Sequence, residues 1–128
     1  MGEAFSNELA AAQVERFALL AEELGEAVQI IGKILRHGAN SYHPNDADEV
    51  PNKELLVKEL GDIQFAVELL CATHDIDEAL IEWYRVEKIK KVEQYLHHQE
   101  YAMKLYRRRW PYSAPKAESE PSSERREG

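Results

Sequence analysis

The chain has 128 residues, of which 44% are hydrophobic and 31% charged, and its formal net charge is −8. This length suits one domain and is too short for two of ordinary size. A strongly negative protein repels DNA and RNA, and no apolar run approaches the roughly 18 residues of a membrane span, so we expect neither a nucleic acid polymer nor a membrane as a partner. The N-terminus lacks the features of a secretory signal, and the single cysteine, Cys71, cannot form an internal disulfide. We therefore expect a cytoplasmic protein.

Three long segments have helical periodicity, and no segment alternates with the period of two that a half-buried strand has. The first predicted helix runs from about Ser6 or Asn7 to His37, with Ser6 as its N-cap. Gly38 stands where a left-handed residue ends a helix. Residues 38–51 carry Gly, Pro, Asn and acidic residues without periodicity, which predicts a loop.

The second predicted helix begins near Asn52, a good N-cap, and ends before Asp75. Asp75 and Glu78 resemble a capping box that opens a third helix, which we expect to continue to about Arg108. The pattern therefore predicts an all-α fold of three long helices.

The final segment, residues 111–128, is rich in Ser, Pro, Glu and Arg and is predicted to be disordered, which limits the folded domain to residues 1–110. Three helices form an open layer, and the first of them is apolar on two sides. One side carries Leu19, Ala27, Ile30 and Ile34, and the other carries Phe17, Leu24, Val28 and Leu35. A helix that is apolar over so wide an arc needs neighbours on both sides, so we expect a homodimer or homotetramer that completes a helical bundle.

Four acidic residues are predicted to face the interior, as one pair on each of the first two helices. Glu23 and Glu26 share a helical face with apolar residues, and Glu59 and Asp62 lie within about 60° of each other inside a second apolar stripe. Either pair alone is more typical of a solvated helix face with ion pairs. Two pairs inside apolar stripes favour a cation site, because buried negative charges require neutralisation.

The donor types narrow the choice of metal. The four acids offer only oxygen ligands, which favours Mg²⁺, with Mn²⁺ as a substitute, over Zn²⁺. A di-iron carboxylate bundle requires Glu-x-x-His pairs, and the sequence has none. We therefore predict a magnesium site formed by Glu23, Glu26, Glu59 and Asp62.

These residues also carry a family resemblance. The segment EELGE at residues 22–26 and the segment ELGD at residues 59–62 resemble the EExxE and ExxD motifs of the MazG-like all-α nucleoside triphosphate pyrophosphohydrolases. The resemblance covers roughly residues 12 to 100, and the gap between the two motifs is longer than in compact members, as in small phage and bacterial proteins of this type. It implies Mg²⁺-dependent hydrolysis of a nucleoside or deoxynucleoside triphosphate to the monophosphate and pyrophosphate, in a helical dimer or tetramer.

This chemistry assigns roles to further residues. Glu22 and Glu23 are the candidate catalytic residues, with Glu22 as an auxiliary ligand or as the group that orients and deprotonates the attacking water. Cations that could bind phosphates are Lys33, Lys53 and Arg85, although an interhelical ion pair is the alternative for Arg85 and a solvated position is the alternative for Lys33. Candidates for contact with the base are His37, Tyr42, His43 and Asn45. Of these four, we predict Tyr42 as the substrate-binding residue.

A non-catalytic interpretation remains beside the enzymatic one. The same interior acids could hold a structural divalent ion or a partner helix in a helical dimer. A basic and aromatic stretch over residues 88–109 could suggest RNA binding, but Glu93 and Glu100 dilute its charge.

Overall fold

The computed structural model describes residues 6–111, in which α-helices are joined by loops and turns and no strand is present. Four helices are found in this range: α1 (Ala11–His37), α2 (Asn52–Ala72), α3 (Glu78–Tyr95) and α4 (Glu100–Arg109). They fall into two compact units, an N-terminal unit of residues 6–76 and a C-terminal unit of residues 77–111. The all-α prediction is confirmed, whereas the single domain of residues 1–110 stays a prediction. Most of the tail for which disorder was predicted, residues 112–128, lies outside the described residues.

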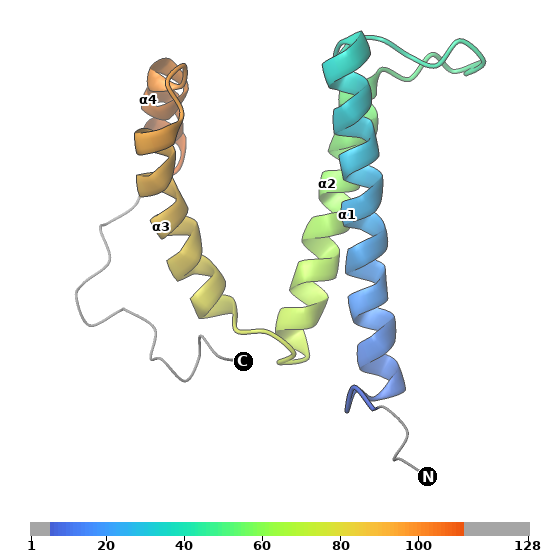
Figure 1. The fold of residues 1–128 in the computed structure, drawn as a ribbon, viewed down its shortest axis with the longest axis vertical. Helices are drawn as coiled ribbons and strands as arrows, with labels where there is room; N and C mark the ends of the chain where they lie inside the picture. The colour runs from blue at the N-terminus through green and yellow to red at the C-terminus, as the bar shows by residue number, and fades with distance from the viewer. Residues whose placement is uncertain (1–5, 112–128) are drawn as a thin grey trace. The chain divides into compact units, whose positions relative to one another are not determined.

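The N-terminal unit is a helical hairpin in which α1 and α2 run side by side in opposite directions (Figure 1). Its core consists of small and branched side chains on the facing sides of the two helices, and Leu70 is fully buried. The other buried hydrophobic residues of the hairpin are Ala27, Ile30 and Ala66. Alanine at two of these positions allows the helices to approach closely, so polar groups between the helices are shielded from solvent.

The start of α1 differs from the prediction. Ser6 and Asn7 form local turns, in which Ser6 Oγ accepts from the Glu8 amide at 3.1 Å and Asn7 Oδ1 accepts from the Leu9 amide at 3.0 Å. Because these side chains are engaged two residues ahead, the helix begins only at Ala11. At the other end Gly38 has φ +98° and its amide donates to Ile34 O at 2.8 Å, so Gly38 ends the helix with the positive φ that was predicted.

Helix α2 begins at Asn52, but Asn52 is not its N-cap as predicted. Pro51 occupies the cap position, and Asn52 is the first helical residue, with only 5% of its surface exposed. Its Nδ2 donates to Gly38 O at 3.2 Å, across the loop of residues 38–51. The side chain therefore ties the end of α1 to the start of α2.

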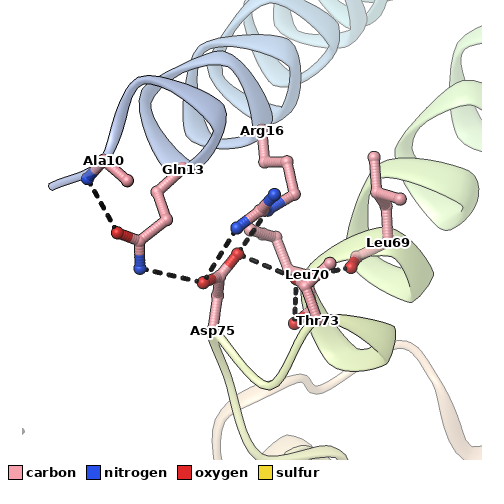
Figure 2. Close-up of polar contacts among 7 residues, drawn as sticks. All are labelled: Ala10, Gln13, Arg16, Leu69, Leu70, Thr73 and Asp75. Carbon is pink, nitrogen blue, oxygen red and sulfur yellow. Dashed lines mark hydrogen bonds and ion pairs between the residues drawn. The ribbon is translucent and has the colours of Figure 1, made fainter.

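Asp75 closes the opposite end of the hairpin (Figure 2). Its carboxylate accepts from Arg16 Nε at 2.5 Å, Gln13 Nε2 at 3.1 Å and Thr73 Oγ1 at 2.9 Å. Only 4% of the Asp75 side chain is exposed, and its bonds to Arg16 and then to Gln13 lower its pKa to about 2. We call Gln13, Arg16, Thr73 and Asp75 the Asp75 cluster. The predicted capping role of Asp75 is wrong, because tertiary contacts with α1 engage its carboxylate.

The third predicted helix is two helices. Asp77 caps α3 by accepting from the amides of Ala79 and Leu80, and Leu96 then adopts an extended conformation with φ −106° and ψ 116°. Within the C-terminal unit α4 contacts α3 through a hydrogen bond from Arg85 Nη1 to Tyr106 Oη at 2.6 Å. A second contact is the ion pair between Glu93 and Arg107. The predicted single continuous helix to Arg108 is therefore wrong, and the two polar contacts join α3 and α4 across the break.

The second apolar side of α1 is exposed in the protomer, as the sequence pattern anticipated. Its residues are 37% to 81% exposed and comprise Phe17, Leu24, Val28 and Leu35. Within residues 6–111, no helix combines the length and the hydropathy that crossing a bilayer requires. Exposed apolar surface of this kind is typical of a protein interface, and the homodimer or homotetramer stays a prediction.

Candidate metal centre

Three of the four predicted ligands meet between α1 and α2. Glu23 and Glu26 lie one turn apart near the middle of α1, and Glu59 lies near the middle of α2. One carboxylate oxygen from each lies within 4.8 Å of the other two. Glu59 is buried, with 6% of its surface exposed, whereas Glu23 and Glu26 are half-buried. We call these three residues the carboxylate cluster.

The carboxylate cluster has two buried oxygens for which the protein provides no hydrogen-bond donor. They are Glu23 Oε2 and Glu59 Oε2, and the statement covers the described part of the chain. A buried carboxylate oxygen without a donor is strongly disfavoured, so the pair requires either a proton or a cation. The donor set contains only hard oxygen atoms, which fits Mg²⁺ or Mn²⁺.

The pKa values show the same requirement. A proton shared with Glu59, followed by burial, raises the pKa of Glu23 to about 7, and the hydrogen bond and the charge of Glu59 raise the pKa of Glu26. The pKa of Glu59 is lowered, chiefly because Glu23 donates to it. Glu23 and Glu59 therefore titrate as a pair, and near neutral pH a proton and a cation compete for binding to this pair.

Among the described residues, Lys58 is a cation in direct contact with these acids, and its role was not predicted from the sequence. Its Nζ lies 2.8 Å from Asp62 Oδ2 and 3.3 Å from Glu59 Oε1, and both contacts raise the pKa of Lys58. The signal was present in the sequence, because Lys58 precedes Asp62 by the four residues that allow an ion pair on one helix. One ammonium group does not neutralise the nearby carboxylates, and it leaves two of their oxygens without a donor.

Asp62 and Glu22 lie beside the carboxylate cluster and are not members of it. Asp62 is half-buried and its charge contributes to the raised pKa of Glu23, but it pairs with Lys58 and does not share the 4.8 Å spacing of the carboxylate cluster. Glu22 is exposed on α1 beside Glu23, and its charge adds to the raised pKa of Glu26. Both therefore lie at the edge of the cluster.

The residues predicted to contact the phosphates and the base lie in three different places. Lys33 and Tyr42 line one pocket at the loop end of the hairpin. Lys53 is exposed in the first turn of α2, and it does not line this pocket. Arg85 belongs to the C-terminal unit, where it pairs with Glu82 at 2.5 Å and donates to Tyr106. The ion pair of Arg85 thus lies within a single helix, not between helices.

Comparison with known proteins adds no relative. No protein-family model, no curated protein and no solved structure matches this chain. The resemblance to the MazG-like proteins therefore rests on residues 22–26 and 59–62 themselves, and family membership stays a prediction.

Proposed function

We propose that the protein is an Mg²⁺-dependent nucleoside triphosphate pyrophosphohydrolase that converts a nucleoside or deoxynucleoside triphosphate and water to the monophosphate and pyrophosphate. The observation that carries this proposal is the meeting of Glu23, Glu26 and Glu59 between two helices, with two buried oxygens that lack a donor among the described residues. Oxygen ligands from both sequence motifs support divalent metal chemistry on a phosphate substrate.

The roles of the acids follow from their positions. Glu23, Glu26 and Glu59 would hold the metal, and Asp62 would join them when Lys58 leaves its carboxylate. Glu22 lies at the exposed edge, where its carboxylate has access to water and is suited to orient and deprotonate the nucleophile. Bound Mg²⁺, or Mn²⁺ as its substitute, would offset the phosphate charge and make a water molecule more acidic.

Substrate contacts are assigned by charge and position. Lys33 and Tyr42 line the pocket at the loop end of the hairpin, and they are suited to contact the phosphates and the base respectively. Lys53 and Arg85 remain proposals that rest on their charge alone. The assembly we propose is a homodimer or homotetramer that covers the exposed side of α1, in a cytoplasmic protein with neither a nucleic acid polymer nor a membrane as partner.

The test is a panel of nucleoside and deoxynucleoside triphosphates, incubated with Mg²⁺ and analysed for products. The expected products are the monophosphate and pyrophosphate, and chelation of the metal should abolish turnover. Diphosphate and orthophosphate as the main products would contradict attack at the α-phosphorus. Glu68→Gln is a suitable control, because Glu68 is an exposed acid on the same helix as Glu59 and lies outside the carboxylate cluster.

A second candidate is a non-catalytic helical dimer in which the same acids hold a structural divalent ion. The exposed apolar side of α1 is compatible with this candidate as well as with the enzyme, because that surface requires a neighbour whether or not the protein has turnover. Stabilisation by Mg²⁺ without turnover of any nucleotide in the panel would favour this candidate over the enzyme.

A further inference from the structure

The N-terminal unit has a pocket at the loop end of the hairpin, separate from the carboxylate cluster. It has a volume of about 470 Å³ and lies between the last turns of α1, the loop of residues 38–51 and the first turn of α2. Four of its lining residues are basic or can become so, namely Lys33, Arg36, His37 and His43. Lys33 was predicted from the sequence to contact phosphate, whereas no role was predicted for Arg36.

Within residues 6–111, the side chains of the two permanent cations of this pocket have no anionic partner. Neither the Lys33 nor the Arg36 side chain forms a hydrogen bond or an ion pair there, whereas Arg16 and Lys58 on the same hairpin both contact carboxylates. Asp46 is the acidic residue of the lining, and its carboxylate accepts from the amides of Asp48 and Val50, at 3.0 Å each. With two permanent cations and one carboxylate in its lining, the pocket therefore has an excess of positive charge on a chain whose net charge is −8.

The loop wall of this pocket is held in place by hydrogen bonds to the first turn of α2. The Asn52 amide donates to Ser41 O at 2.8 Å, and the Lys53 amide donates to Ala39 O at 2.9 Å. Asn52 Nδ2 also donates to Gly38 O, and this side chain is almost completely buried. These bonds satisfy helix N-terminal amides with loop carbonyls, so the pocket is formed before any ligand arrives.

The pocket and the carboxylate cluster lie one after the other along the hairpin. Lys33 follows Glu26 by seven residues, which places it on the same face of α1 and about 10 Å further along the axis. Side chains on a helix lean toward its N-terminus, which for Lys33 and Arg36 is the direction of the carboxylates. On α2, Leu55 of the pocket precedes Glu59 by one turn.

We propose that this pocket binds a pyrophosphate group, with Lys33 and Arg36 as the phosphate-binding residues. If the protein has the function proposed above, this group is the β,γ end of the nucleotide whose α-phosphate lies at the carboxylate cluster, and that assignment rests on the proposed function. A guanidinium group contacts two phosphate oxygens at once, while an ammonium group supplies a point charge, so the two side chains complement each other. The rise along the helix from Glu26 is about 10 Å to Lys33 and about 15 Å to Arg36, and it is bridged by the length of the two side chains and of the polyphosphate.

The test is calorimetric titration of inorganic pyrophosphate into the full chain in buffer freed of metal by a chelating resin. Without metal the carboxylate cluster repels the anion, so binding reports on the pocket. We expect the parent to bind and the double variant Lys33→Ala/Arg36→Ala to bind at least about tenfold more weakly, because each charged hydrogen bond contributes more than a tenfold factor. The matched control Lys91→Ala/Arg108→Ala removes the same two charges from exposed positions of the C-terminal unit, and it should bind as the parent does.

Two results would overturn the proposal: equal affinity of the parent and the Lys33→Ala/Arg36→Ala variant, or no binding of pyrophosphate to the parent. Both side chains are exposed, so the double variant is expected to keep its fold, and its circular dichroism should match that of the parent. Lys33→Gln/Arg36→Gln is the second variant for the same measurement, and it keeps most of each side-chain length. If pyrophosphate binds but no nucleotide is hydrolysed, the hydrolase proposal fails and the anion site stands.

Discussion

Substitution of Glu59 by glutamine tests whether the carboxylate cluster serves metal binding and catalysis or the stability of the fold. In the metal-free parent, Glu59 is buried against Glu23 and Glu26 with Lys58 as the only nearby cation described. Glu59→Gln removes one negative charge and supplies an amide donor, while Lys58 keeps its contact with Asp62. We therefore expect the variant to lose most of its turnover and yet to melt, without metal and above the Glu23 pKa of about 7 where both acids are ionised, at the same temperature as the parent or higher.

Magnesium should raise the melting temperature of the parent more than that of the Glu59→Gln variant. At a concentration of about one hundred times Kd, a ligand that binds only the folded state stabilises the parent by about 2.7 kcal/mol. Loss of one of three carboxylates weakens binding on the order of a hundredfold, which leaves about 0.4 kcal/mol in the variant at the same concentration. The difference corresponds to a melting shift on the order of 10 °C for a domain of this size.

The assays are thermal unfolding with and without Mg²⁺ and turnover on the best nucleotide of the panel. Glu68→Gln, which makes the same charge change at an exposed position of α2, should respond to Mg²⁺ as the parent does. If Glu59→Gln instead loses several degrees without metal and keeps its turnover, Glu59 is a structural ion-pair residue and the proposed site is wrong.

Three further predictions concern pH and packing. Because the pKa of Glu23 is raised from 4.5 to about 7, its protonation favours the folded state below pH 4.5, and this stability is lost as pH rises through about 7. The melting temperature of the metal-free protein should thus fall between about pH 5 and 8 and flatten with Mg²⁺; an equal slope with and without metal would contradict this. The pKa of Asp75 is lowered from 3.8 to about 2, so the stability that Asp75 contributes is present above pH 3.8 and is lost as pH falls toward 2. Asp75→Asn should melt lower at pH 7 and lack this acid phase, and identical curves for variant and parent would exclude the role. Leu70→Ala should cost about 2 to 5 kcal/mol in urea unfolding because Leu70 is fully buried, whereas Val57→Ala, at a position 67% exposed, should cost much less.

Local pattern was sufficient to predict the all-α fold, the first two helices and the meeting of three of the four acids. The wheel positions of Glu23, Glu26 and Glu59 follow from the 3.6-residue period, and that period survives folding because each helix carries its own hydrogen bonds. Asp75 was assigned to a local cap, since nothing in its neighbourhood indicates a partner such as Arg16, which lies 59 residues earlier in the chain. Such a contact depends on tertiary packing and has no local signature.

The break between α3 and α4 was missed for a related reason. Residues 96–99 contain neither glycine nor proline, so periodicity continues across them in the sequence. The contact of Arg85 with Tyr106 forms only when the chain turns back after Leu96, and such a contact has no signal in the local pattern of residues 96–99. The roles of Lys58 and Arg36 were overlooked because a cation near acids or near a helix end usually lies on a solvated surface.

The hairpin is fastened at both ends, by the Asp75 cluster at one and by Asn52 at the other, and the carboxylate cluster lies near mid-span. The spacing of the acids is therefore set by two anchored helices, and it does not depend on how long the loop of residues 38–51 is. Insertions or substitutions in that loop would reshape the pocket that Lys33 and Arg36 line, while the register of Glu23 and Glu26 against Glu59 stays the same. Ligand preference could then diversify among descendants of this chain by changes in one exterior segment, without any compensating change in the residues that would hold the metal.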